Sequence, residues 1–184
     1  MENRKLQVFI SSTYTDLKEE RQVAVQAVLR SGNIPAGMEL FKADDKSQMA
    51  VIDNWIDQSD VYLLILGGRY GSLDKESNKS YTQLEYEYAL SKQTPVFAIV
   101  LSDKFLQDKA NKTSKETIYE QQNRTLYNNF KDQVTSKMVE FASDAKDIRS
   151  SILAKMYDFK DDKKLIGWIR TNEVEQNSSL LRTE

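Results

Sequence analysis

Three groups of polar residues have the types and spacing that suit chemistry on a nucleotide. The first is Ser11-Ser12-Thr13, which follows the apolar run Leu6–Ile10 and precedes a helical pattern. Hydroxyls and free backbone N–H groups at the start of a helix suit a phosphate, so we expect all three residues to bind ligand. Serine and threonine are also common in turns and helix caps, and that structural interpretation stays open.

The second group is the glycine-rich segment Gly67-Gly68-Arg69-Tyr70-Gly71, which follows the apolar run Val61–Leu66. Glycine lets a backbone approach a ligand closely or adopt positive φ, and an arginine can hold a phosphate with two N–H donors. We therefore expect Arg69 and Tyr70 to contact the ligand. The alternative is a tight turn with a solvated arginine, because the spacing matches neither a Walker loop nor the dinucleotide-binding fingerprint.

The third group lies on a short helix expected at about Thr82–Lys92, where Glu85 is the candidate catalytic residue. Glu85 shares a helix face with Tyr81, the best candidate to stack on a base, and aromatic surroundings can raise the pKa of a carboxyl. Two alternatives stay open. Thr82 and Glu85 match a capping box, which would make Glu85 structural, and Glu87 is a rival acid rotated away by about 200°.

The composition narrows the chemistry further, because the chain contains no cysteine and no histidine. Disulfides, thiolate nucleophiles, Ser-His triads and the usual zinc sites are excluded. The net charge of −2 with dispersed signs gives no argument for a nucleic-acid partner. Asp44-Asp45 and the pair Asp57 and Asp60 are better explained as solvated charges than as metal ligands, so we expect no metal site.

The length of 184 residues fits one domain, and 40% hydrophobic with 29% charged residues is ordinary for a soluble globular protein. No apolar run approaches the ~20 residues that span a bilayer. The start of the chain, MENRKLQVFISS, has too short an apolar run for a signal peptide. These features predict a cytoplasmic protein with no membrane partner.

Apolar runs alternate with amphipathic segments along the chain. Pro35 and Gly37 place the second strand at a sheet edge, Asp16 with Glu19 predicts a capping pair for the first helix, and Ser102–Lys115 is expected to be a surface loop. The expected strands are Leu6–Ile10, Ile34–Leu40, Val61–Leu66, Val96–Leu101 and Met138–Phe141, and the expected helices are about Asp16–Arg30, Ser47–Gln58, Thr82–Lys92, Glu116–Thr135 and Asp144–Phe159.

Alternating strands and helices with right-handed crossovers favour a doubly wound, five-stranded parallel sheet of flavodoxin-like order 2-1-3-4-5. The first and third strands are then neighbours, and their loops, Ser11–Thr15 and Gly67–Ser72, meet at the switch point. We therefore expect the three polar groups to line one pocket. The domain is expected to cover residues 1–160, with residues 161–184 an extension that begins a linker to a downstream region.

Several segments in the same order resemble the family of unknown function DUF4062: VFISSTYTDLKEER, IPAGMELF, VIDNWIDQSDVYLLILGGRYGS and SYTQLEYEYAL. Members of that family typically sit at the N-terminus of larger signalling and defence proteins, often before an NTPase or repeat region. The resemblance therefore implies a role in signalling or antiphage defence and a downstream domain.

The same segments are similar to TIR domains. VFISSTYTD is similar to the opening strand and loop, MELFKADDKS to the BB loop, and Ser80–Glu85 to the motif whose glutamate serves NAD cleavage, with Tyr81 replacing tryptophan and Thr82 replacing cysteine. This similarity implies that Glu85 is catalytic, that NAD is the substrate with no cofactor required, and that residues 39–48 bridge neighbouring copies.

The expected function is an assembly-dependent NAD glycohydrolase in which Ser11–Thr13 and Arg69 hold phosphate and ribose. Pyridinium is a good leaving group, so no general acid is needed, which agrees with the absence of histidine. Two alternatives stay open. One is a module that binds a nucleotide or its own copy without catalysis. The other is an enzyme like the nucleoside deoxyribosyltransferases, which EYEYALSKQTPV resembles.

Overall fold

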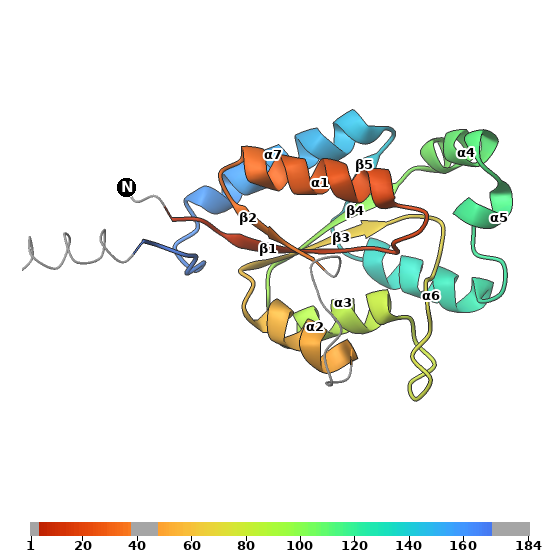
Figure 1. Cartoon of the computed structure of the whole chain (residues 1–184), viewed down its shortest axis with the longest axis horizontal. Helices are drawn as coiled ribbons and strands as arrows, with labels where there is room; N and C mark the ends of the chain where they lie inside the picture. The colour runs from red at the N-terminus through yellow and green to blue at the C-terminus, as the bar shows by residue number, and fades with distance from the viewer. Residues whose placement is uncertain (1–3, 38–47, 171–184) are drawn as a thin grey trace, which may run out of the picture.

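The computed structural model describes residues 4–37 and 48–170 (Figure 1). Within these residues, strands and helices alternate along the chain as the sequence predicted. The elements are β1 (Gln7–Ser11), α1 (Lys18–Arg30), β2 (Ile34–Ala36), α2 (Gln48–Asp57), β3 (Val61–Leu66), α3 (Tyr81–Ser91), β4 (Val96–Leu101), α4 (Asp103–Lys112), α5 (Lys115–Ile118), α6 (Arg124–Thr135), β5 (Glu140–Ala142) and α7 (Ala145–Lys160).

One five-stranded sheet runs through the described part of the chain in the order β2-β1-β3-β4-β5, and every neighbouring pair is parallel. The predicted doubly wound, flavodoxin-like α/β fold is therefore confirmed. β2 is an edge strand, as Pro35 indicated, but it is shorter than expected and ends at Ala36. Residues 38–40 of that predicted strand lie outside the described residues. Residues 39–47 of the proposed self-association loop also lie outside them.

Helices cover both faces of the sheet, with α1 and α7 on one side and α2, α3 and α6 on the other (Figure 1). Side chains alternate between the faces along β1: Val8 and Ile10 join the core beneath α1 and α7, and Phe9 joins the core beneath the other three helices. Ser11 is the next residue in this alternation, so it points to the face that carries α3. β3 is apolar throughout because both of its faces are buried.

Three expectations about the helices were wrong. Residues 103–112 form α4 rather than a loop, with Ser102 as its N-cap, because Leu106 and Ala110 supply a buried helical stripe. The single helix expected at Glu116–Thr135 is two helices, α5 and α6, separated by residues 119–123. α1 begins at Lys18, and its N-cap, Leu17, makes no side-chain cap, so Asp16 and Glu19 form no capping pair.

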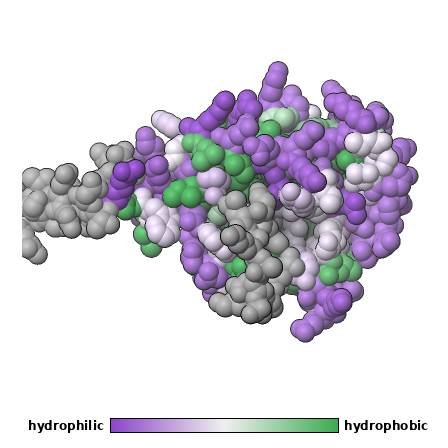
Figure 2. Space-filling view, in the orientation of Figure 1, coloured by the Kyte–Doolittle hydropathy of each residue, from purple (hydrophilic) through white to green (hydrophobic). Residues whose placement is uncertain are grey.

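The surface of the described residues is mainly hydrophilic, with small separate hydrophobic groups (Figure 2). None of the helices in the described ranges has the length and apolar content needed to cross a bilayer. The residues after α7 pack back on the domain: Leu165 is 6% exposed, and Lys5 and Trp168 pair in an antiparallel bridge. A domain boundary at residue 160 stays a prediction, although residues up to 168 contact the sheet region.

Candidate functional site

Glu85 owes its position to the way α3 begins. The N-cap of this helix is Ser80, whose hydroxyl accepts a hydrogen bond from the Gln83 N–H at 3.1 Å. Thr82 therefore lies inside the first turn, and Glu85 is too far along the helix to reach back to the cap. The capping-box alternative for Glu85 is wrong, so its carboxyl does not cap the N-terminus of the helix.

The Glu85 side chain instead contacts the end of β1. The Ser11 hydroxyl donates to Glu85 Oε2 at 2.5 Å, and the two residues are 2% and 3% exposed, respectively. Among the described residues this is the one hydrogen bond that the carboxyl makes, so Oε1 has no donor there. Oε1 keeps some solvent access, so a ligand or water in the cavity that Glu85 lines can bond to it.

The environment of Glu85 places its titration near neutral pH. Burial raises the pKa of Glu85 from 4.5 to about 7, while the Ser11 hydrogen bond and the charge of Arg21 lower it and Asp53 raises it. The hydroxyl of Tyr62 lies in the same buried region, where burial and the charge of Glu85 hold its pKa well above the ordinary value. Glu85 can therefore gain or lose a proton under physiological conditions.

Arg21 is a site residue that we did not predict. It is 5% exposed, and its guanidinium donates to the Ser12 hydroxyl at 2.9 Å, which in turn donates to the Thr13 carbonyl at 2.7 Å. The signal was present in the sequence, because Arg21 interrupts the apolar face of α1 between Leu17 and Ala24. A charge on a buried helix face needs a partner, and here it orders the loop after β1.

The opposite wall forms where the glycine-rich loop meets residues 118–123. The Glu120 carboxylate accepts backbone N–H bonds from Tyr70 at 2.9 Å, Gln122 at 3.1 Å and Asn123 at 3.0 Å. Although burial raises the pKa of Glu120, these bonds lower it overall, so Glu120 stays ionised. A Cβ on Gly68 would lie 2.5 Å from the Ile118 carbonyl oxygen, so this close approach requires glycine.

Between these walls lies a cavity of about 730 Å³ at the carboxyl ends of β1 and β3. Its volume is typical of small-molecule sites, which measure roughly 300–1,000 Å³, and its position is the switch point of the sheet. The lining residues are Ile10, Ser11, Ser12, Thr13, Tyr14, Thr15, Asp16, Arg21, Arg69, Gly71, Ser72, Tyr81, Glu85, Glu120, Gln121, Gln122 and Asn123.

The cavity brings together Ser11, Ser12, Thr13, Arg69, Tyr81 and Glu85, which the sequence had predicted to share one site. Tyr70 is the exception. Its side chain is 1% exposed, its ring packs against Phe130 at a centroid distance of 6.3 Å, and its hydroxyl donates to Gln83. The chain turns after Arg69, so the next side chain points into the core beneath α6. The structure therefore does not place the Tyr70 side chain in this cavity.

The rival acid Glu87 and one of the two candidate metal pairs have structural partners. Glu87 pairs with Lys79 at 2.7 Å and lies outside the cavity lining. Asp57 pairs with Lys92 on the surface, and Asp60 accepts two backbone N–H bonds. Asp44 and Asp45 lie outside the described residues. The described ranges contain no cluster of three acidic, histidine or cysteine side chains that could hold a metal ion.

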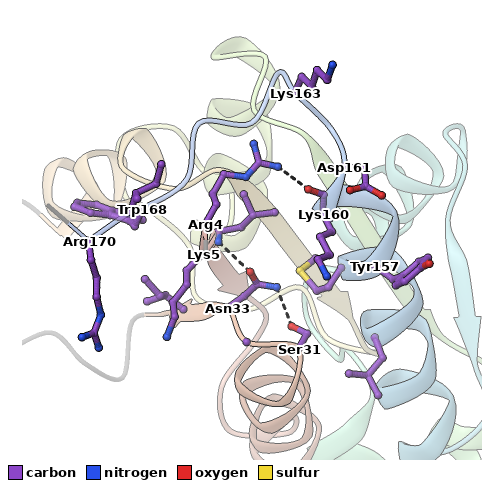
Figure 3. Close-up of a pocket in the computed structure, with 16 residues that line it drawn as sticks. Arg4, Lys5, Ser31, Asn33, Tyr157, Lys160, Asp161, Lys163, Trp168 and Arg170 are labelled. Atoms are coloured by element: carbon purple, nitrogen blue, oxygen red, sulfur yellow. Dashed lines mark hydrogen bonds between the residues drawn. The ribbon is translucent and has the colours of Figure 1, made fainter. Parts of the chain in front are cut away.

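A second, larger cavity of about 1370 Å³ lies at the amino ends of the strands, near the start of β1 and the end of α7 (Figure 3). Many of its polar groups bond to neighbouring protein groups: Arg4 donates to the Lys160 carbonyl at 2.8 Å, and Asn33 donates to the Ser31 hydroxyl at 2.9 Å. It contains none of the predicted site residues.

Comparisons with known proteins bear on the family to which the chain belongs. Among solved structures, a mutant flavo di-iron protein from Thermotoga maritima matches 83% of this chain with 14% identity and a TM-score of 0.43; this chain spans 36% of that one, about a third of its length. No curated protein matches the chain. The family model described as "Domain of unknown function (DUF4062)" matches residues 7–157, most of the chain. The chain therefore belongs to the DUF4062 family.

Proposed function

We propose that this α/β domain cleaves the bond between nicotinamide and ribose in NAD, with Glu85 as the catalytic residue. The observation that carries the proposal is the buried Glu85 carboxyl, which is bonded to Ser11 at the carboxyl end of β1 and lines a cavity of about 730 Å³. The similarity of Ser80–Glu85 to the TIR motif, and of the domain to a signalling and defence family, supports the same reaction.

The lining residues give each part of NAD a suitable contact. Tyr81 is partly exposed at the start of α3 and offers a ring face for a base. Arg69 is also partly exposed, with its guanidinium 3.5 Å from the Thr117 carbonyl, so it can turn toward a phosphate. The loop that contains Ser12 and Thr13 is ordered by Arg21, which presents it to the ligand without a large rearrangement.

In the proposed reaction the bond between C1′ and the pyridinium nitrogen breaks, and its electron pair leaves with neutral nicotinamide. The ionised Glu85 carboxylate stabilises the positive charge that develops at C1′. Water then forms a bond to C1′ and releases one proton, which Glu85 can accept. The balance is NAD⁺ and water giving ADP-ribose, nicotinamide and one proton. A dry, buried carboxyl is strongest in this role.

The direct test is to incubate the purified protein with NAD, both dilute and under forced oligomerisation or crowding, and to measure nicotinamide and ADP-ribose by chromatography. The proposal expects both products in equal amounts, with more under assembly. A parallel assay offers a 2′-deoxynucleoside and a free base, because base exchange would support the deoxyribosyltransferase alternative. Binding of NAD with no product in either assay would support the non-catalytic module.

A further inference from the structure

Thr13 and Asp16 form a polar pair on the β1 side of the cavity that the proposed reaction does not yet use. They are 9% and 6% exposed, respectively, and both line the cavity. The Thr13 hydroxyl and both Asp16 carboxylate oxygens lack a hydrogen-bond partner within the described residues. Weak hydrogen-bonding contacts with the Thr13 side chain and the Asp16 backbone N–H lower the pKa of Asp16, although burial raises it overall, and neither contact has the geometry of a full hydrogen bond.

The pair differs from two other polar groups that line the same cavity. Ser11 bonds to Glu85, and Glu120 accepts three backbone N–H bonds. A buried polar group without a partner costs about 1–3 kcal/mol, and α1 does not use Asp16 as a cap. No full hydrogen bond within the described residues compensates for the burial of the Thr13 hydroxyl and the two Asp16 oxygens. A ligand that hydrogen-bonds to these three oxygens best explains why they are buried there.

The chemistry of the pair selects the ligand group. A carboxylate with two free oxygens accepts two hydrogen bonds from neighbouring donors, and a threonine hydroxyl beside it can donate or accept one more. Two adjacent hydroxyls, as in the 2′,3′-diol of a ribose, match this set, and proteins commonly use an acidic side chain to bind ribose hydroxyls. Burial raises the pKa of Asp16 overall, and the charges of Arg69 and Lys109 partly offset that rise.

We propose that Asp16, assisted by Thr13, binds the vicinal hydroxyls of a ribose, so that the site takes ribosides in preference to 2′-deoxyribosides. This inference rests on the proposed function and names its substrate class. It assigns Asp16 a binding role separate from the catalytic role proposed for Glu85, which bonds to Ser11. A deoxyribosyltransferase would need the opposite preference.

The test measures binding of three small probes by NMR titration of the whole chain: ribose 5-phosphate, 2-deoxyribose 5-phosphate and nicotinamide. None of them contains a glycosidic bond, so the result does not depend on NAD cleavage. We expect ribose 5-phosphate to bind about tenfold or more tightly than its deoxy analogue, because a hydrogen bond to a charged group is lost. The Asp16→Asn variant should reduce that ratio to about threefold or less.

Two further variants keep the test decisive. Thr13→Val removes the hydroxyl with little change in volume and should reduce the ratio by a smaller factor, even if Asp16→Asn folds poorly. Asp158→Asn, on the exposed face of α7, is the matched control and should leave the ratio unchanged. Equal binding of the two sugars by the wild type, or loss of nicotinamide binding alone in Asp16→Asn, would overturn the proposal. A preserved sugar preference without NAD cleavage would overturn only the proposed reaction.

Discussion

The amino ends of the parallel strands (the amino edge) and their carboxyl ends (the carboxyl edge) each carry a cavity lined by charged residues. The polar groups of the two cavities differ in how completely they are hydrogen-bonded. At the amino edge, the Arg4 guanidinium donates to three backbone carbonyls at the end of α7, those of Lys160, Asp162 and Leu165. Asp60 accepts the N–H groups of Gln7 and Gly167, both at 2.8 Å. These bonds join the start of β1 to the segment after α7, so this edge serves to hold the chain together.

At the carboxyl edge some of the buried polar side chains are incompletely bonded. Glu85 has one donor, and Thr13 and Asp16 lack partners within the described residues. The amino-edge cavity is nearly twice as large, about 1370 Å³ against about 730 Å³. The comparison shows that size is a poor guide here. The carboxyl edge is the better candidate site because Asp16 and Glu85 are buried beside a cavity at the switch point of the sheet, where burial raises the pKa of both acids.

The strongest test of this difference is the replacement Glu85→Gln. A neutral amide cannot stabilise the charge that develops at C1′, so nicotinamide release should fall by roughly a hundredfold or more. The matched control is Glu87→Gln, two residues along α3 and bonded to Lys79 outside the cavity lining. It should retain nearly full activity. An equal loss in both variants would show that the effect acts through folding.

The same variant should change how stability depends on pH. Burial raises the pKa of Glu85 from 4.5 to about 7, so between these values the folded state holds a proton that the unfolded state has released. The free energy of unfolding of the wild type should therefore fall as the pH rises through this window, by up to about 1.4 kcal/mol per pH unit from this group.

Glu85→Gln has no titrating carboxyl at this position, so its free energy of unfolding should lack that fall with pH. Relative to the wild type, the free energy of unfolding of the variant should therefore rise by on the order of 2 kcal/mol between about pH 5 and about pH 8. Denaturant unfolding at the two pH values measures the gain, with Glu87→Gln again as the control. Parallel stability profiles for the wild type and Glu85→Gln would contradict the burial of an ionisable carboxyl at this position.

At the amino edge the expected effect is on stability alone. Arg4→Met keeps much of the side-chain volume but removes the donors to three carbonyls, so we expect a loss of about 1–2 kcal/mol in the free energy of unfolding. Nicotinamide release at a temperature where the variant is folded should not change. Lys5→Met is the control, because the described contacts of Lys5 are made by its backbone. Reduced activity with unchanged stability would reverse the roles of the two edges.

Much of the fold and part of the site could be predicted from local patterns. Continuous apolar runs indicated β3 and β4, and the alternation with helices favoured the strand order that the structure has. That order alone brings the end of β1 to α3, which is why Ser11 and Glu85 could be expected to meet although 74 residues separate them. The helix α4 was missed because its mostly polar sequence obscures a stripe of only two buried residues, Leu106 and Ala110.

The remaining site residues depend on contacts that no local pattern contains. Glu120 is one acid in a polar stretch, and its role comes from the backbone N–H of Tyr70, 50 residues earlier in the chain. Asp16 looked like a helix cap, and only the start of α1 at Lys18 shows that it faces the cavity. Tyr70 seemed suited to a ligand because it adjoins Arg69, but its direction depends on the packing of Phe130.

The smallest expected effect tests whether the basic side chains of the amino-edge cavity bind an anion. Lys163 lines that cavity and is exposed, and Figure 3 shows it at the rim, away from the bonds of Arg4. If this edge is only structural, Lys163→Ala should change the free energy of unfolding by less than about 0.5 kcal/mol, as is usual for an isolated surface charge. The melting temperature, measured with and without inorganic phosphate, should shift equally in the variant and the wild type. A phosphate-dependent rise that is lost in Lys163→Ala would show that the larger cavity also holds an anion, and the contrast between the two edges would then concern which ligand each one binds.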